Sequence, residues 1–190
     1  MKGNPFFTQL RPGKDEKIFK MIKLRTMTCQ KDENGELLPD EVRLTKYGKF
    51  LRSTSIDELP ELINILKGDM SVVGPRPQLI KDMVFMTHEQ RKRHFALPGL
   101  TGLAQINGRN NISWEDKFKY DLQYIQKISF INDVKIILFT VISVFKRSDI
   151  NTNGMETAED YGDYLLRTAH INECEYIEKI DESKILSVIK

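Results

Sequence analysis

The strongest apolar run in this sequence is too short to cross a membrane, and this limit constrains the fold more than any other feature. The run covers residues 136–145, inside DVKIILFTVISVFKR, with a lysine at each end. A helix needs about 20 mostly apolar residues to span the hydrocarbon core of a bilayer. The first residues, MKGNPFFTQL, also lack the apolar core of a signal peptide. We therefore expect a chain that crosses no membrane, with residues 136–145 either in its core or against lipid.

The composition is that of an ordinary globular protein, but the charge is unevenly distributed. Of the 190 residues, 40% are hydrophobic and 29% are charged, which suits one domain with a sizeable core. Residues 151–190 hold 9 acids and 4 bases, whereas residues 1–150 hold 18 acids and 25 bases. The basic body favours an anionic partner, whether phosphate, nucleic acid or a membrane surface, without choosing between them.

Cysteine and histidine spacing argues against a zinc site and against a disulfide framework. Cys29 and Cys174 are far apart and fit no metal-binding spacing, and no histidine cluster accompanies them. A reducing compartment is therefore favoured.

Local patterns predict mainly helices, with a small β-hairpin near the N-terminus. Residues 6–27 form the hairpin, with Pro12 and Gly13 at the central positions of a type II turn. MSVVG is a short buried strand, and PGLTGLAQINGRNN is a glycine-punctuated loop. The expected helices are LTKYGKFLRS, DELPELINILKG closed by Gly68, WEDKFKYDLQYIQKI capped by Ser113, and the apolar helix described above. These elements describe one helix-rich α+β domain.

The segment STSIDELPEL, residues 53–62, places two adjacent carboxylates at the start of an expected helix. Ser55 and Glu58 match the Ser-x-x-Glu capping box, so one interpretation is that the acids only cap the helix. In the other, Asp57 lies in the first helical turn, where free N–H groups and the helix dipole lower a carboxyl pKa and attract phosphate. That setting suits an anionic nucleophile acting on a phosphoryl group. By spacing alone, capping is the commoner outcome, and both interpretations stay open.

Basic residues in other segments are candidates for binding phosphate. Arg76 stands between Pro75 and Pro77, which fix the backbone on both sides and pre-organise the guanidinium for bidentate contacts. A plain loop arginine in a rigid turn explains the same pattern equally well. Lys23 and Arg25 share one strand face by the two-residue period, although a solvated face is the commoner reason for such a pair.

Two further segments supply weaker candidates. The helix LTKYGKFLRS carries Arg52 near its end, which brings this side chain close to Asp57. The segment NGRN contributes Asn107 and Arg109, although by itself it describes a plain turn.

Five blocks in this order, RPG, KLRTM, LRSTSIDELPELINILKGDMSVVGPRP, PGLTGLAQINGR and SWEDKFKYDLQYI, resemble the bacterial sugar transferase family. These are the monotopic polyprenyl-phosphate phosphoglycosyl transferases, and the match runs through most of residues 5–150. The resemblance implies a Mg2+-dependent enzyme that moves a sugar-1-phosphate from a UDP-sugar to polyprenyl (undecaprenyl) phosphate and releases UMP. This reaction begins the assembly of surface polysaccharides or glycoprotein glycans, at the cytoplasmic face of the bacterial inner membrane.

The resemblance also implies a role for each candidate residue. Asp57 would be the nucleophile that forms a phosphosugar-aspartyl intermediate, with Mg2+ beside it. Glu58 would assist proton transfer or help to organise the metal, and the sequence does not separate these roles. The implied binding residues are Lys23, Arg52 and Arg76 for the phosphates, and Asn107 and Arg109 for the nucleotide.

Two departures from the family pattern affect these expectations. Family members carry an apolar re-entrant helix before the segment that matches PFFTQLRPG, and this sequence begins after it. The sequence also continues with an acidic segment, so we expect a catalytic domain over residues 1–155 and an extension of unknown role over residues 156–190. A monotopic domain would lie on the membrane surface, would be soluble if the anchor is truly absent, and is a possible homodimer.

Two other functions remain open from the sequence. The first is a non-catalytic fragment that keeps the fold and binds a membrane surface. The second is an RNA-binding domain, which only the basic body and the interspersed aromatic residues suggest, without any RNA-binding signature. We therefore expect no nucleic acid partner.

Overall fold

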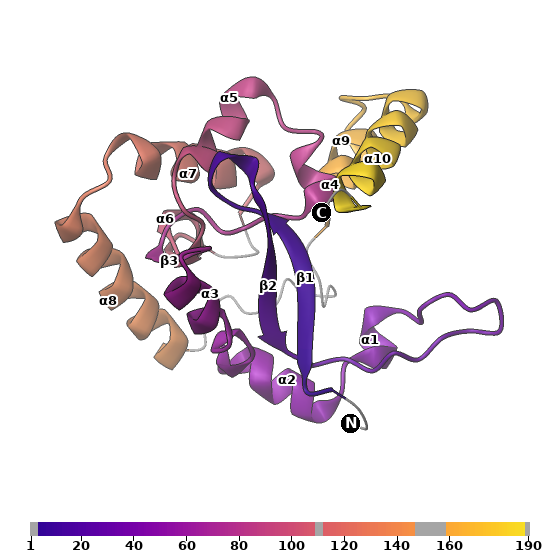
Figure 1. The fold of residues 1–190 in the computed structure, drawn as a ribbon, viewed down its shortest axis with the longest axis horizontal. Helices are drawn as coiled ribbons and strands as arrows, with labels where there is room; N and C mark the ends of the chain where they lie inside the picture. The colour runs from indigo at the N-terminus through magenta and orange to yellow at the C-terminus, as the bar shows by residue number, and fades with distance from the viewer. Residues whose placement is uncertain (1–3, 109–111, 147–158, 189–190) are drawn as a thin grey trace.

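The structure is a computed structural model, and it describes residues 4–108, 112–146 and 159–188. This part of the chain consists of two small sheets and the helices around them (Figure 1). The helices of that part are α1 (Asp40–Arg43), α2 (Lys46–Ser53), α3 (Glu61–Lys67), α4 (Ile80–Met83), α5 (His88–Arg91), α6 (Leu103–Ile106), α7 (Trp114–Gln126), α8 (Phe130–Lys146), α9 (Tyr161–Arg167) and α10 (Glu173–Val188). Short 3-10 turns occupy Lys14–Glu16, Ile56–Glu58 and Lys92–Phe95. The arrangement confirms the expected helix-rich α+β domain.

β1 (Phe6–Pro12) and β2 (Ile18–Leu24) form the expected antiparallel hairpin, which runs through the middle of the molecule (Figure 1). The expected type II turn was wrong. Such a turn needs a positive φ at its second central residue, whereas Gly13 has φ −105° and ψ −153°. The connection spans residues 13–17 instead, and the Gly13 N–H donates to the Lys17 carbonyl at 2.9 Å.

β3 (Ser71–Val73) and β4 (Gly99–Thr101) form a second sheet, and this pair is parallel. The strand β3 was expected, but the loop expected over PGLTGLAQINGRNN was wrong, because β4 and α6 occupy most of its described part. Its glycines serve close backbone packing: a Cβ atom on Gly99 would lie 2.1 Å from the main-chain nitrogen of Gly74. The glycine pattern thus marks a tight strand contact as well as a loop.

Buried apolar side chains form three clusters that tie the helices to the sheets. The first contains Phe19, Met21 and Met70, the second Val73, Tyr124 and Ile136, and the third Met86, Trp114, Phe118 and Tyr161. Trp114 and Phe118 belong to α7, whose cap at Ser113 is confirmed by a 3.1 Å bond from the Asp116 N–H. Tyr161 begins α9, so the C-terminal segment packs into the same core. The division after residue 155 lies outside the described residues and stays a prediction.

The helix α8 is only partly buried, and it lies at one edge of the molecule (Figure 1). Its Ile136 is buried, whereas most of its other apolar side chains are exposed, Leu138, Phe139 and Ile142 among them. Within the described ranges, no helix is both long enough and apolar enough to cross a bilayer. The apolar run therefore contributes one side to the core and leaves its other side uncovered.

Candidate active site

The two adjacent carboxylates lie in a 3-10 turn that precedes α3, not in the first turn of an α-helix. The turn begins at Ser55, whose φ of 55° is left-handed and whose side chain makes no capping hydrogen bond. Pro60 follows as the N-cap residue of α3, again without a side-chain cap. Because proline has no N–H to contribute to a helix, it is tolerated at this boundary. The capping-box interpretation was therefore wrong.

Asp57 is buried, and the pKa of its carboxyl group is raised. Burial is the main cause, and the negative charge of Glu58 adds to it, while the positive charges of Lys23, Arg52 and Arg76 act in the opposite direction. A position in the first turn of an α-helix predicts instead that the helix dipole lowers this pKa. That expectation was wrong, since the 3-10 turn separates Asp57 from the N-terminus of α3 and burial dominates.

Glu58 binds two cations through the same oxygen atom. Lys23 Nζ donates to Glu58 Oε1 at 2.9 Å, and Arg76 Nη2 donates to it at 2.5 Å. Burial opposes ionisation of Glu58, but Arg76 and Lys23 outweigh it and hold the pKa of this carboxyl well below its usual range. Glu58 in turn raises the pKa of Arg76. The surroundings thus shift the pKa values of the two neighbouring acids in opposite directions.

Glu61 is a third carboxylate of this site, and sequence reasoning missed it. It begins α3, it is 2% exposed, and its Oε1 lies 3.1 Å from Lys23 Nζ. Burial raises the pKa of Glu61, and the lysine opposes this rise. The available signal was spacing, because Glu61 follows Glu58 by three residues and such positions share one side of a helical turn.

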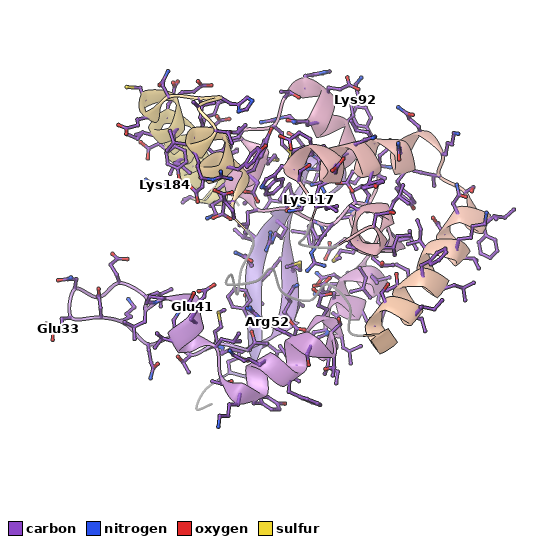
Figure 2. The ribbon with its side chains drawn as sticks, turned by 180° about the vertical axis from the view of Figure 1, so that it is seen from behind. Glu33, Glu41, Arg52, Lys92, Lys117 and Lys184 are labelled. Atoms are coloured by element: carbon purple, nitrogen blue, oxygen red, sulfur yellow. The ribbon has the colours of Figure 1, made fainter. Side chains whose placement is uncertain are left out.

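The helix α2 brings Arg52 to the end of the hairpin and close enough to Asp57 for the expected electrostatic interaction between them. Its Nε donates to Thr26 Oγ1 at 3.2 Å, just after β2, and Figure 2 shows Arg52 where α2 meets the hairpin. Its positive charge lowers the pKa of Asp57. Arg25 binds a different residue from those that Lys23 binds, because its Nη1 donates to Cys29 Sγ at 3.4 Å. The structure therefore separates the two bases that the strand pattern grouped on one face.

The two candidates for nucleotide binding, Asn107 and Arg109, are not placed beside the carboxylates by any described contact. Asn107 follows α6, is exposed, and donates from Nδ2 to the Leu103 carbonyl at 2.7 Å. No contact between Asn107 and the carboxylates appears among the described residues. Arg109 lies outside those residues.

The chemistry of the site suits an anionic, phosphate-bearing ligand. Asp57 and Glu58 provide adjacent carboxylates, and Lys23, Arg52 and Arg76 supply fixed positive charge from three separate parts of the chain. Positive groups held in place before a substrate arrives are what phosphoryl transfer requires.

Comparison with known proteins identifies the family. The chain belongs to the bacterial sugar transferase family, whose model matches residues 1–147. It is 52% identical over 160 residues to the uncharacterized sugar transferase EpsL of Bacillus subtilis (strain 168), a match covering 84% of this chain and 79% of that protein. It is also 42% identical over 153 residues to the galactosyl transferase CpsE of Streptococcus agalactiae serotype III (strain NEM316), which covers 73% of this chain and 34% of that protein.

A further relative carries its reaction in its name. The chain is 42% identical over 154 residues to the UDP-glucose:undecaprenyl-phosphate glucose-1-phosphate transferase of Klebsiella pneumoniae, covering 76% of this chain and 33% of that protein. The chain therefore spans about a third of the length of CpsE and of the Klebsiella transferase. The resemblance that the sequence blocks indicated is confirmed.

Proposed function

We propose that this chain transfers a sugar-1-phosphate from a UDP-sugar to polyprenyl phosphate through a covalent intermediate on Asp57. The observation that carries the proposal is the arrangement around the two adjacent carboxylates, Asp57 and Glu58, which we call the dyad. Asp57 is buried beside an ionised Glu58 that holds Lys23 and Arg76 in place. The names of the relatives support the substrate class, because several act on UDP-sugars and a lipid carrier.

The first step forms a bond between a carboxylate oxygen of Asp57 and the phosphorus atom that carries the sugar. The bond from that phosphorus to the bridging oxygen breaks, and UMP leaves with the electron pair. A raised pKa makes the ionised Asp57 more basic and thus a better nucleophile than an exposed aspartate. In the second step, an oxygen of polyprenyl phosphate attacks the same phosphorus and displaces the carboxylate.

Lys23 and Arg76 bind the phosphates in this proposal. Glu58 already orders both cations, so little reorganisation is needed when the substrate arrives. An ionised carboxylate paired with two cations is suited to organising charge rather than to carrying a proton. We therefore assign Glu58 to charge organisation.

The donor set of the site also fits Mg2+. Asp57 and Glu58 supply adjacent carboxylate oxygens, and magnesium sites commonly combine one or two carboxylates with phosphates of the substrate. Among the described residues, no group of three or more histidine, cysteine, aspartate or glutamate side chains is placed to hold a metal ion by itself. Bound there, the metal ion would neutralise charge on the diphosphate oxygens.

Exposed apolar side chains support contact with a membrane, where the lipid acceptor is found. α8 exposes the apolar face described above, and α3 exposes Leu62, Ile63 and Leu66, the last of them 88% exposed. Exposed apolar surface next to basic residues is typical of proteins that lie on a bilayer. We propose that the chain works at the cytoplasmic face of the inner membrane.

Splitting the reaction into its two steps tests this function. The protein is incubated with UDP-glucose or UDP-galactose and Mg2+, UMP is measured, and the intact mass is recorded. We expect a gain of one sugar phosphate on the peptide that contains Asp57, its loss in D57N, and its removal by undecaprenyl phosphate. A folded wild type that releases no UMP and forms no adduct with any UDP-sugar, yet binds liposomes, would show a non-catalytic membrane-binding fragment instead.

A further inference from the structure

The backbone that carries Arg76 is held at three consecutive carbonyl groups. In the segment Pro75–Pro77, the first carbonyl accepts from the Gly99 N–H at 3.0 Å, and the middle one, of Arg76, accepts from Arg93 Nη2 at 2.6 Å. The last accepts a longer bond of 3.4 Å from Arg11 Nη1. The prolines restrict the dihedral angles of this segment, but these contacts decide where it lies in the molecule.

The donor to the Arg76 carbonyl is itself fixed by a buried ion pair. Arg93 donates from Nε and Nη2 to Asp121 Oδ2 at 2.9 and 2.7 Å, and the two side chains are 1% and 3% exposed. Arg93 belongs to the 3-10 turn before β4, and Asp121 lies in the middle of α7. One guanidinium therefore connects α7 to the backbone of Arg76.

Stability alone is a weak reason for such a pair. Removing two charges from water costs free energy that their attraction often fails to return, and apolar replacements of buried ion pairs are frequently neutral or stabilising. A planar fork with several donors is instead suited to holding two acceptors in a fixed relation. The guanidinium of Arg93 does this for a carboxylate and a main-chain carbonyl.

We propose that Arg93, anchored by Asp121, is a positioning residue that sets the location of Arg76 for phosphate binding and transfer. The proposal rests on the proposed function of Arg76. Arg93 acts through the backbone of Arg76 rather than through contact with the substrate. Loss of the bond to the Arg76 carbonyl is therefore expected to slow the reaction while the charge of Arg76 is retained.

The test compares Arg93→Lys with Arg91→Lys as a matched control. Arg91 makes an ion pair with Glu16 at 3.0 Å and none of the three bonds to the Arg76 segment, so the control makes the same chemical change nearby. Hydrogen exchange measured by mass spectrometry on peptides covering residues 71–80 should be faster in R93K and unchanged in R91K. With UDP-glucose or UDP-galactose and Mg2+, kcat/KM for UMP release per folded molecule should fall about tenfold in R93K, which is about 1.4 kcal/mol of transition-state stabilisation.

A double variant separates positioning from general damage. If Arg93 acts through Arg76, R76K and R76K/R93K should have similar turnover, because effects on one interacting unit are not additive. Additive losses, or unchanged exchange over residues 71–80 in a folded R93K, would overturn the proposal. If R93K does not fold, R11K replaces it in the same measurements. Its kcat/KM for UMP release should fall less, by about threefold, because the bond from Arg11 is longer. Unchanged exchange over residues 71–80 in R11K would likewise overturn the idea that these side-chain contacts position the Arg76 segment.

Failure of the proposed function has a different appearance. In that case the wild type releases no UMP, or R76K is as active as the wild type. The exchange measurement still shows whether Arg93 holds the backbone of residues 71–80. If R76K is slowed but a folded R93K is not, the role of Arg76 stands and the positioning role of Arg93 fails.

Discussion

Neutralising the two adjacent acids one at a time should change stability in opposite directions. In Glu58→Gln, Lys23 and Arg76 lose the anion that both of them bind, at 2.9 and 2.5 Å. Hydrogen bonds to charged groups contribute about 1.5 to 3 kcal/mol each when well buried. The exposed fractions of the Lys23, Glu58 and Arg76 side chains are 16%, 19% and 41%, so solvent screening reduces the total to about 1–2 kcal/mol. For a chain of this size, E58Q should lower the Tm by roughly 3–6 °C.

Asp57→Asn should raise the Tm instead. Burial and the negative charge of Glu58 impose a free-energy cost on the ionised form of the Asp57 carboxyl group, which is why its pKa is raised. An amide of the same shape removes that cost and leaves the backbone turn unchanged. The same variant should lose the sugar-phosphate adduct, so stability and activity should change in opposite directions.

The pH dependence of each variant follows from the direction of the pKa shift. A raised carboxyl pKa favours the folded state most in acid, and that contribution is lost as pH rises through the folded value. The advantage of D57N should therefore be absent below about pH 3.8, the ordinary value, and grow above it. Glu58 has a lowered pKa, so it stabilises the fold above about pH 4.5, and the penalty of E58Q should fade as pH falls.

Thermal unfolding of wild type, D57N and E58Q between pH 2 and pH 8 measures both profiles. Circular dichroism at each pH shows whether the variants reach the native fold before heating. Equal losses of Tm in the two variants at pH 7 would refute the reasoning, since they would mean that Asp57 is stabilised by its surroundings as Glu58 is.

Three more predictions follow from the structure. R76K keeps the charge but loses the planar fork, so UMP release should fall by at least about tenfold in a continuous assay, and near-normal turnover would exclude a bidentate role. Burial lowers the pKa of His94 to about 3, so the free energy of unfolding should decline as pH falls below 6.5. Urea titrations should show a loss of about 1–2 kcal/mol at pH 5, and a smaller loss in H94Q. Liposomes of anionic lipid should bind the chain weakly and release it as the salt concentration rises. Leu66→Gln should weaken this binding at every salt concentration, because Leu66 is exposed. Binding that changes neither with salt nor in L66Q would contradict a membrane-facing surface on α3 and α8.

Elements governed by local chemistry could be predicted from the sequence. The alternating pattern of β2, the serine that caps α7 and the glycine that ends α3 with φ 81° are where the sequence placed them. Each depends on residues within a few positions of one another, so no distant contact is needed to specify it. The ordered blocks also indicated the family, and they placed Asp57 and Glu58 together with the bases that surround them.

The sequence could not predict how distant segments meet. β3 and β4 pair across about 28 residues, and the glycines that make this possible have the same appearance in sequence as loop glycines. The turn at Pro12 was misjudged for a related reason, since the length of a hairpin connection depends on where the strand pairing stops.

The ionisation of the dyad was likewise decided only by the tertiary structure. Asp57 and Glu58 are neighbours in sequence with the same chemistry, and only their placement distinguishes them. Glu58 meets Lys23 and Arg76, which lie 35 and 18 residues away, whereas Asp57 is buried beside a like charge. Glu61 joins them for the same reason. Burial and Coulomb energy depend on distance in space. The sequence therefore indicated most residues of this site, whereas the fold added Glu61 and determined the direction in which each carboxyl pKa is shifted.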